Sequence, residues 1–129
     1  MYRIEFGYGN LGFGRLRVID TTCGVVFKCN ARTGSISNGK LINALPRGLW
    51  YGKTKPVYTK EESMIIKPEI RGWKFRLYDQ FKKRTSYLIH PDGNKPGTLG
   101  CIGVFGMHWE LRSLLNFIMY QQKGIKIFV

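Results

Sequence analysis

Two consecutive segments, Gly14–Asp20 (GRLRVID) and Cys23–Cys29 (CGVVFKC), indicate the fold class of this chain. In the first segment, Leu16 and Val18 alternate with charged residues, which is the period-2 pattern of a half-buried β-strand. The second segment is an apolar run of strand length that begins beside Gly24. Short runs of this kind in a chain with sixteen glycines favour a mainly β fold.

The rest of the chain extends this pattern and adds one helix. We expect further strands at Tyr2–Tyr8, Leu49–Tyr51, Ser63–Ile66, Gly72–Tyr78, Tyr87–His90, Cys101–Phe105 and Ile125–Val129. From Met107 to about Gln122, apolar residues recur at spacings of three and four, which predicts an amphipathic helix that ends near Gly124. Thr33-Gly34 and Asn38-Gly39 are turn signals. The 129 residues fit one domain, residues 1–129.

The chain is strongly basic. Twenty-one Lys and Arg residues against eight Asp and Glu residues give a formal net charge of +13. This charge fits two polyanionic partners, nucleic acid and the anionic bacterial envelope, and it also fits a merely solvated surface. Residues 1–10 contain no apolar segment of the kind found in signal peptides, and no stretch approaches the ~20 apolar residues of a membrane span.

The three cysteines do not form a disulfide framework. Cys23 and Cys29 stand at opposite ends of an expected strand, and six extended residues span about 20 Å. A disulfide requires Cα atoms within roughly 7 Å, so a Cys23–Cys29 bridge is not expected. The spacing also fits no common zinc motif. Cys101 therefore needs a separate explanation.

His90 and Cys101 form the one constellation with a chemical interpretation. The strand Tyr87–His90 leads into the Gly- and Pro-rich loop Pro91–Thr98, after which Gly100 precedes Cys101. A folded loop can bring the two side chains within hydrogen-bond reach. An imidazole beside a thiol lowers the pKa of the thiol and transfers its proton. We therefore predict Cys101 as a nucleophile, His90 as its base, and backbone amides near Gly100 as donors to an oxyanion.

Two structural interpretations stay open. A cysteine after a glycine is often a small buried apolar residue, and a histidine at a strand end is often structural. A zinc site made of His90, Cys101 and His108 would lack a fourth ligand at a usual spacing. We expect no metal and no organic cofactor.

The run Tyr87-Leu88-Ile89-His90, a glycine-containing loop and then Thr98-Leu99-Gly100-Cys101-Ile102 resemble the catalytic signature of L,D-transpeptidases. Those enzymes carry a histidine, a spacer and then Ser/Thr-His-Gly-Cys-Ile/Val-Arg. The lead-in from Arg84 resembles compact members, including toxin-like effectors. Residues 16–34 are similar to the opening hairpin of the family, and residues 45–50 to its Thr-Pro-x-Gly-x-Tyr/Phe segment. The resemblance covers roughly residues 14–105 and implies a β-sandwich or barrel with one packed α-helix near the C-terminus.

The chain departs from that signature at two positions. Leu99 stands where the family has the histidine before Gly-Cys, and Gly103 stands where it has an arginine. Carboxylate recognition is therefore expected from Arg84 or Lys95, with Leu99 also near the substrate. The run Lys82-Lys83-Arg84 is expected beside the site because it lies upstream of His90. Thr98, or a backbone carbonyl near Leu99, is expected to orient His90.

The resemblance implies a reaction on peptidoglycan stem peptides. Cys101 would attack the carbonyl of the central diamino acid, expel the terminal D-amino acid, and pass the acyl group to an amine or to water. The enzyme would then be an L,D-transpeptidase or an L,D-carboxypeptidase without a cofactor. Made in the cytoplasm, it would act in the periplasm or cell wall as a phage protein or antibacterial effector, with a delivery or immunity protein as a further partner.

Two other functions compete with this one. The charge, and aromatic residues such as Trp50, Tyr51 and Trp73 that we expect to be exposed, suit a basic nucleic-acid-binding module without catalysis. This alternative gives no reason for the arrangement of His90, loop and Cys101. A catalytically inactive relative that binds the wall or inhibits another enzyme is the third possibility.

Overall fold

The structure is a computed structural model and describes residues 1–59, 72–92 and 100–129. Within these ranges the chain forms eleven strands and one helix. They are β1 (Tyr2–Tyr8), β2 (Phe13–Asp20), β3 (Gly24–Thr33), β4 (Ser35–Ser37), β5 (Lys40–Ile42), β6 (Leu49–Gly52), β7 (Val57–Thr59), β8 (Gly72–Tyr78), β9 (Arg84–Pro91), β10 (Ile102–Phe105), α1 (His108–Gln121) and β11 (Ile125–Phe128). The expected strand Ser63–Ile66 and the expected site residues Lys95, Thr98 and Leu99 lie outside the described residues.

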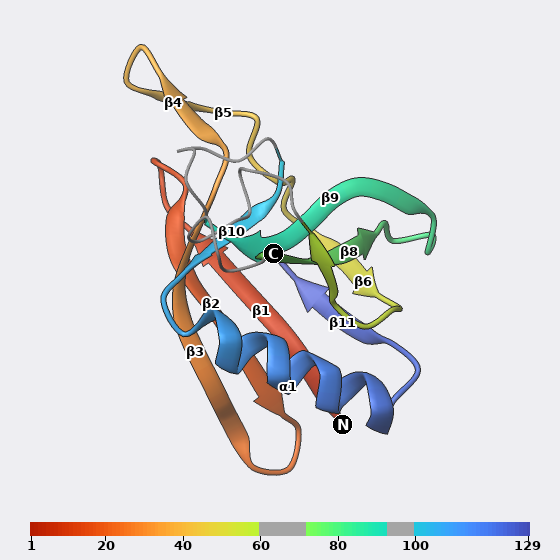
Figure 1. Cartoon of the computed structure of the whole chain (residues 1–129). Helices are drawn as coiled ribbons and strands as arrows, with labels where there is room; N and C mark the ends of the chain where they lie inside the picture. Colours follow the sequence, from red (N-terminus) through yellow and green to blue (C-terminus); the bar gives the residue numbers. More distant parts are fainter. Residues whose placement is uncertain (60–71, 93–99) are drawn as a thin grey trace.

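Eight of the strands close into a barrel. Their order is β6-β11-β1-β2-β3-β10-β9-β8, and the pairing of Tyr51 with Tyr78 joins β8 back to β6. Strand β7 adds to β8 outside this ring, and β4 and β5 form a separate hairpin that projects from one end (Figure 1). Most neighbours are antiparallel, but β1–β11 and β9–β10 are parallel. The expected mainly β barrel with one C-terminal helix is confirmed.

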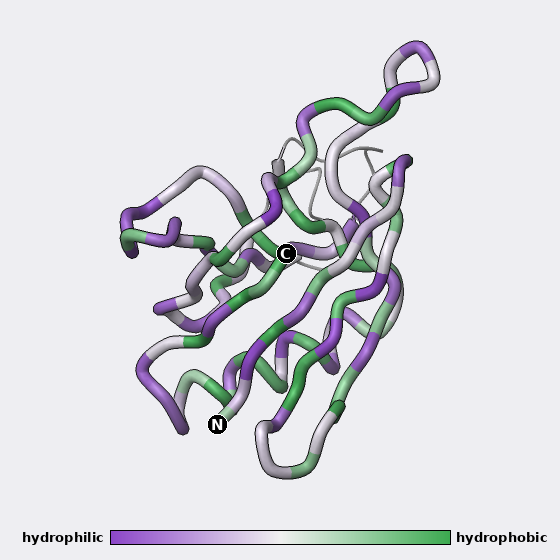
Figure 2. The backbone as a smooth tube through the Cα atoms, turned by 180° about the vertical axis from the view of Figure 1, so that it is seen from behind, coloured by the Kyte–Doolittle hydropathy of each residue, from purple (hydrophilic) through white to green (hydrophobic). Residues whose placement is uncertain are grey.

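Strand β2 shows how the sequence builds the wall of the barrel. Leu16 and Val18 are fully buried, as their alternation with Arg15 and Arg17 predicts. Hydrophilic and hydrophobic segments alternate along the backbone tube in Figure 2. Ile19 is also buried, which strict alternation does not predict. Ile19 keeps regular pairing with β1 and lies outside the core that contains Leu16 and Val18, so its burial is on the opposite face, next to a register shift that places an extra residue in β3.

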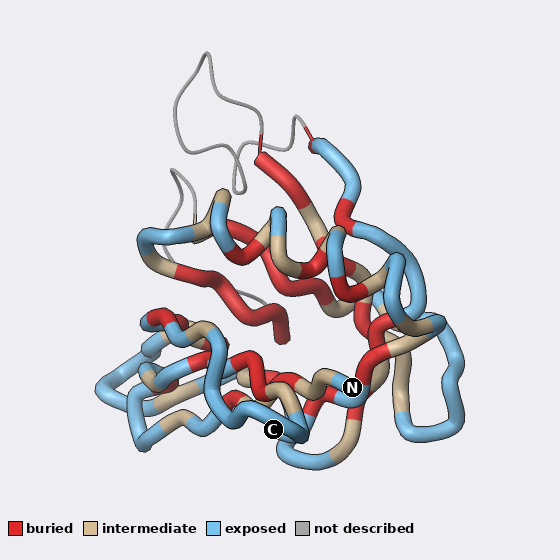
Figure 3. The backbone as a smooth tube through the Cα atoms, turned by 90° about the horizontal axis from the view of Figure 1, so that it is seen from below, coloured by how far each residue is buried: buried red, intermediate tan, exposed pale blue. Residues whose placement is uncertain are grey.

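Helix α1 packs its apolar stripe against the inner face of the sheet. Leu111, Leu115 and Ile118 are fully buried and belong to the same hydrophobic core as the barrel interior, which appears red in Figure 3. The Gln122 side chain ties the end of the helix to β1, since Tyr2 N–H donates to its Oε1 at 2.9 Å and its Nε2 donates to the Tyr2 carbonyl at 3.0 Å. None of the helices within the described ranges is long and apolar enough to cross a membrane.

The loop and cysteine expectations have clear outcomes. Asn38 and Gly39 both have positive φ, 51° and 74°, so the predicted turn is confirmed as the hairpin turn between β4 and β5. Cys23 and Cys29, both in the described part of the chain, are free thiols, which agrees with the expectation that they do not form a disulfide with each other.

Candidate active site

The parallel pair β9–β10 brings together the two residues that the sequence singles out. His90 of β9 is the register partner of Gly103 of β10, and Ile89 is the partner of Ile102. Cys101 therefore stands two residues before the position opposite His90. With strands ~4.8 Å apart and a rise of ~3.3 Å per residue, this offset corresponds to a Cα–Cα separation of about 8 Å.

Cys101 and His90 lie on the same face of this strand pair. Ile89 and Ile102 point into the main core, whereas Leu88 and Cys101 contact each other in a small separate cluster. Leu88 and His90 share a face because side chains two residues apart on a strand point the same way. Both residues are buried, with exposed fractions of 9% for Cys101 and 4% for His90.

The imidazole of His90 is held by a backbone carbonyl. Its Nδ1 lies 2.6 Å from the carbonyl oxygen of Pro91. A carbonyl oxygen only accepts hydrogen bonds, so Nδ1 carries the proton in the neutral ring and Nε2 keeps its lone pair. Sequence reasoning expected this orienting group near Thr98 or Leu99, and a carbonyl does fill the role here, but it belongs to the residue directly after His90.

Gly100 is required by its backbone and by a close approach. Its φ is +72°, and a Cβ on it would overlap the ring of Tyr87. The Gly100 N–H donates to the carbonyl oxygen of Asn43 at 2.6 Å. That amide is therefore occupied, and an oxyanion donor must come from another position. Gly100 thus lets the backbone before Cys101 pack directly against the Tyr87 ring.

An arginine lies across the sheet from His90, on a strand that sequence reasoning did not connect with the site. Arg32 of β3 is the register partner of Gly103, which in turn is the partner of His90, so the three residues form one cross-strand row. Gly103 places no side chain between the other two. Arg32 Nη2 donates to Asp92 Oδ1 at 3.2 Å, and its Nε lies 3.0 Å from Oδ2.

The Arg32–Asp92 pair sets the electrostatics beside His90. The Asp92 carboxylate is 7% exposed and follows β9, where its N–H donates to the Val104 carbonyl at 2.9 Å. Burial raises the pKa of Asp92 above its usual range, while the charge of Arg32, its hydrogen bond to the carboxylate and, when the ring is protonated, the charge of His90 act in the opposite direction. The carboxylate that the sequence left unassigned is therefore an electrostatic neighbour of both residues.

Arg84 does not reach the Cys101–His90 pair. It begins β9 and lies six residues from His90, about 20 Å along an extended strand. The run Lys82-Lys83-Arg84 is therefore at the far end of β9, and the expectation that it lies beside the site is wrong. Arg84 does line a groove of about 300 Å³ whose other end is Leu88, the contact of Cys101.

That groove follows the outer surface of β7, β8 and β9. Four cationic residues line it together with Leu88: Lys55, Lys74, Arg76 and Arg84. The Arg76 guanidinium is partly fixed, since its Nη1 donates to the Thr85 carbonyl at 3.1 Å. The groove therefore presents cationic side chains on the same surface as Leu88, the contact of Cys101.

The other candidate residues lie elsewhere. His108 begins α1, with its ring 5.2 Å from that of Trp109, and burial lowers its pKa. Cys29 is buried in the main core, where burial raises the pKa of its thiol to about 11. Across residues 1–59, 72–92 and 100–129, no group of three or more His, Cys, Asp or Glu side chains is arranged to hold a metal ion.

The aromatic residues that suggested nucleic-acid binding are largely interior. Trp73 is fully buried, Trp50 is 9% exposed, and both belong to the hydrophobic core. Tyr51 alone of the three remains half-exposed. The two tryptophans are therefore unavailable for stacking on bases, and the expectation that they are exposed is wrong.

Sequence reasoning missed Arg32 and Asp92. Asp92 carried a signal, since it follows the candidate base His90 by two residues. Arg32 carried none, because it becomes a neighbour of His90 only through the pairing of β3 with β10.

No protein-family model matches the chain, and neither a curated protein nor a solved structure is significantly similar to it.

Proposed function

We propose that this protein is a cysteine acyltransferase or hydrolase that acts on peptidoglycan stem peptides in the manner of L,D-transpeptidases. The observation that supports the proposal is the parallel β9–β10 register, in which the buried Cys101 and His90 share one face and His90 is held through Nδ1. A thiol and an oriented imidazole with a lone pair are the minimal set for nucleophilic cysteine chemistry.

The proposed reaction proceeds in two balanced steps. Nε2 of His90 takes the proton of the Cys101 thiol while Sγ forms a bond to the carbonyl carbon of the central diamino acid. The C–N bond to the terminal D-amino acid then breaks, and the amine leaves with the proton from His90. In the second step an amine or water attacks the thioester and gives its proton through His90 to the sulfur. The products are a crosslinked or exchanged peptide, or a free acid.

The surroundings of the pair suit an anionic peptide. Stem peptides carry free carboxylates, and the four cations of the β7–β9 groove lie on the same surface as Leu88. Lysine and arginine bind carboxylates through charge-assisted hydrogen bonds. In this proposal, Arg76 and Lys74 replace Arg84 as the groove residues nearest to Cys101, because Arg76 is the register partner of Leu88.

The setting of the reaction is part of the same proposal. A substrate in the cell wall requires action in the periplasm or wall after delivery from the cytoplasm. An antibacterial or phage-borne role would add a delivery or immunity protein as a partner.

The experiment is turnover of a purified stem tetrapeptide. Wild-type protein should release the terminal D-amino acid, and Cys101→Ala should release none. Cys23→Ser is the matched control, because this exposed thiol lies outside the site, and it should retain full activity. If Cys101→Ala turns over the peptide at the wild-type rate, the proposal is wrong.

A further inference from the structure

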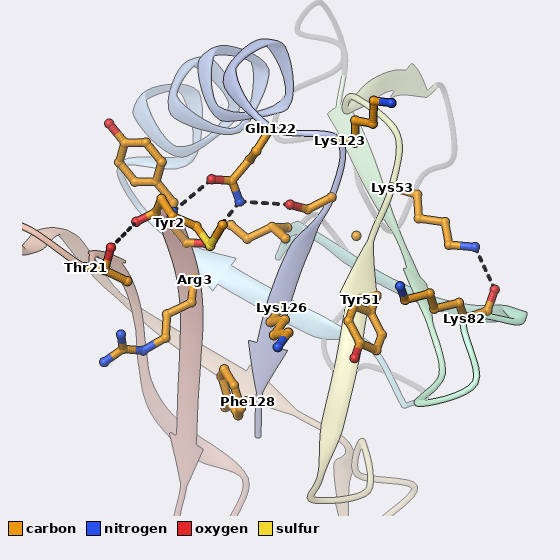
Figure 4. Close-up of a pocket in the computed structure, with 14 residues that line it drawn as sticks. Tyr2, Arg3, Thr21, Tyr51, Lys53, Lys82, Gln122, Lys123, Lys126 and Phe128 are labelled. Atoms are coloured by element: carbon orange, nitrogen blue, oxygen red, sulfur yellow. Dashed lines mark hydrogen bonds between the residues drawn. The ribbon is translucent and has the colours of Figure 1, made fainter.

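A second cavity lies apart from Cys101 and His90, neither of which lines it. It has a volume of about 600 Å³ and is bounded by the end of α1, the start of β1 and the strands β11 and β6 (Figure 4). Five cationic residues line it: Arg3, Lys53, Lys82, Lys123 and Lys126. None of its lining residues in the described part of the chain is acidic. A volume of this size is typical of ligand sites.

The sheet places like charges side by side on one wall of this cavity. Lys126 of β11 is the register partner of Arg3 on β1 and of Tyr51 on β6, so the three side chains form a cross-strand row (Figure 4). Like charges directly opposite each other across strands destabilise a sheet. Among the described residues, Glu5 is the one carboxylate in an ion pair with any of the five cations, and it contacts Arg3 at 3.0 Å. The excess positive charge is therefore largely uncompensated within the protein.

A strained turn holds Lys82 over the cavity. Lys82 has a φ of +61°, a conformation that non-glycine residues rarely adopt. The Asp79 side chain stabilises the turn by accepting from the N–H groups of Phe81 and Lys83 at 2.8 and 3.0 Å. The Lys53 ammonium donates to the Lys82 carbonyl at 2.8 Å. Non-glycine backbone strain of this kind is concentrated at functional sites.

Two aromatic rings here position lysines, whereas Phe128, which also lines the cavity, is 42% exposed. Lys82 Nζ lies 5.2 Å from the ring centre of Tyr51, and Lys53 Nζ lies 4.7 Å from that of Tyr78. Base stacking needs an uncovered aromatic face. With Phe128 as the one exposed aromatic residue among the described lining residues, against five cations, the cavity favours a ligand recognised mainly by its charge.

We propose that this cavity binds a base-free phosphodiester chain, of the poly(glycerol phosphate) type. Lysines act as point charges toward phosphate, and a chain with repeated single charges matches cations spread along a cavity wall. The site is separate from Cys101 and His90, because Lys82 precedes β9 and His90 lies near the end of that strand. The inference goes beyond the proposed acyl-transfer function and does not depend on it.

The test measures binding of fluorescein-labelled poly(glycerol phosphate) by anisotropy at physiological salt. The cavity variant is Lys82→Gly combined with Lys126→Gln. Glycine suits the positive φ of residue 82, so this change removes a charge and relieves strain. The matched control is Arg15→Gln combined with Lys28→Gln, which removes two exposed cations from the outer face of β2 and β3. Thermal unfolding verifies that both variants fold.

We expect the cavity variant to weaken binding at least tenfold and the control variant less than threefold. Cys101→Ala should bind as wild type does, which separates this site from the acyl-transfer proposal. Equal losses in the two double variants would overturn the inference, because they would show attraction by net charge alone. No binding by wild type, or tighter binding of an oligothymidylate with the same number of phosphates, would also overturn it.

Discussion

The Nδ1 atom of His90 lies 2.6 Å from the carbonyl oxygen of Pro91, the residue that follows it. This contact leaves Nε2 as the basic nitrogen. His90→Ala should lower kcat about 10²–10⁴-fold, the usual contribution of general acid–base catalysis. Stopped assays on a stem tetrapeptide measure the change. A kcat within threefold of wild type would exclude His90 as the base.

The three cysteines should differ in their rates of alkylation. Cys101 should react fastest with iodoacetamide near pH 7, because the neighbouring imidazole promotes its thiolate. Cys29 should be nearly inert, because burial raises the pKa of its thiol to about 11. Peptide mapping by mass spectrometry gives all three rates in one sample. His90→Ala should slow Cys101 and leave Cys23 unchanged; an unchanged Cys101 rate would contradict activation by His90.

Gly100 and Gly106 make a matched pair for testing how the backbone before Cys101 packs against Tyr87. Both have positive φ, +72° and +62°, so alanine at either position costs about 1 kcal/mol of backbone strain. A Cβ on Gly106 meets nothing within 4 Å, whereas one on Gly100 overlaps the Tyr87 ring. Gly100→Ala should therefore destabilise by about 1–3 kcal/mol more than Gly106→Ala, as overpacking does. Urea denaturation checks this, and equal losses would show that the contact with Tyr87 is unimportant.

Asp92 should make the protein less stable as pH rises. Its pKa is raised on folding, mainly by burial, so between the unfolded and folded pKa values the native state binds more protons than the unfolded chain. The free energy of unfolding must then decrease with pH across that window. The difference between wild type and Asp92→Asn, measured in urea from pH 3.5 upward, should decline and then level off.

Asp20 supplies a control of opposite sign. Its pKa is lowered, chiefly by the backbone N–H of Thr22, which donates to Oδ1 at 2.8 Å. Its contribution to stability is present above the unfolded pKa and is lost as pH falls. The difference between wild type and Asp20→Asn should therefore rise with pH. Parallel trends for the two variants would contradict the assignment of Asp92.

The sequence predicted the local features well, because they depend on neighbouring residues. The alternation around Leu16 and Val18, the helix after Met107 and the turn at Asn38-Gly39 each carry their own pattern. The proximity of His90 and Cys101 was also foreseeable, since only a loop separates the two strands that the apolar runs Tyr87–His90 and Cys101–Phe105 predict.

Long-range pairing explains what the sequence did not show. Arg32 lies near His90 because β3 pairs with β10. Arg84 lies far from His90 because β9 begins three residues earlier than the apolar run suggests, which places Arg84 at the opposite end of the strand. Trp73 is flanked in the sequence by charged residues, yet its side chain is fully buried in the core of the barrel. None of these placements follows from local composition, because each depends on which strands become neighbours in the closed barrel.

The most direct test of the central claim is the intact mass of the protein after rapid mixing with a stem tetrapeptide and acid quench. The account predicts an adduct equal to the peptide less its terminal D-amino acid, attached to Cys101 and labile to hydroxylamine, as a thioester is. The adduct should be absent in Cys101→Ala and accumulate slowly in His90→Ala. Product formation by wild type with no adduct at Cys101, or an adduct on Cys23 or Cys29 instead, would contradict it.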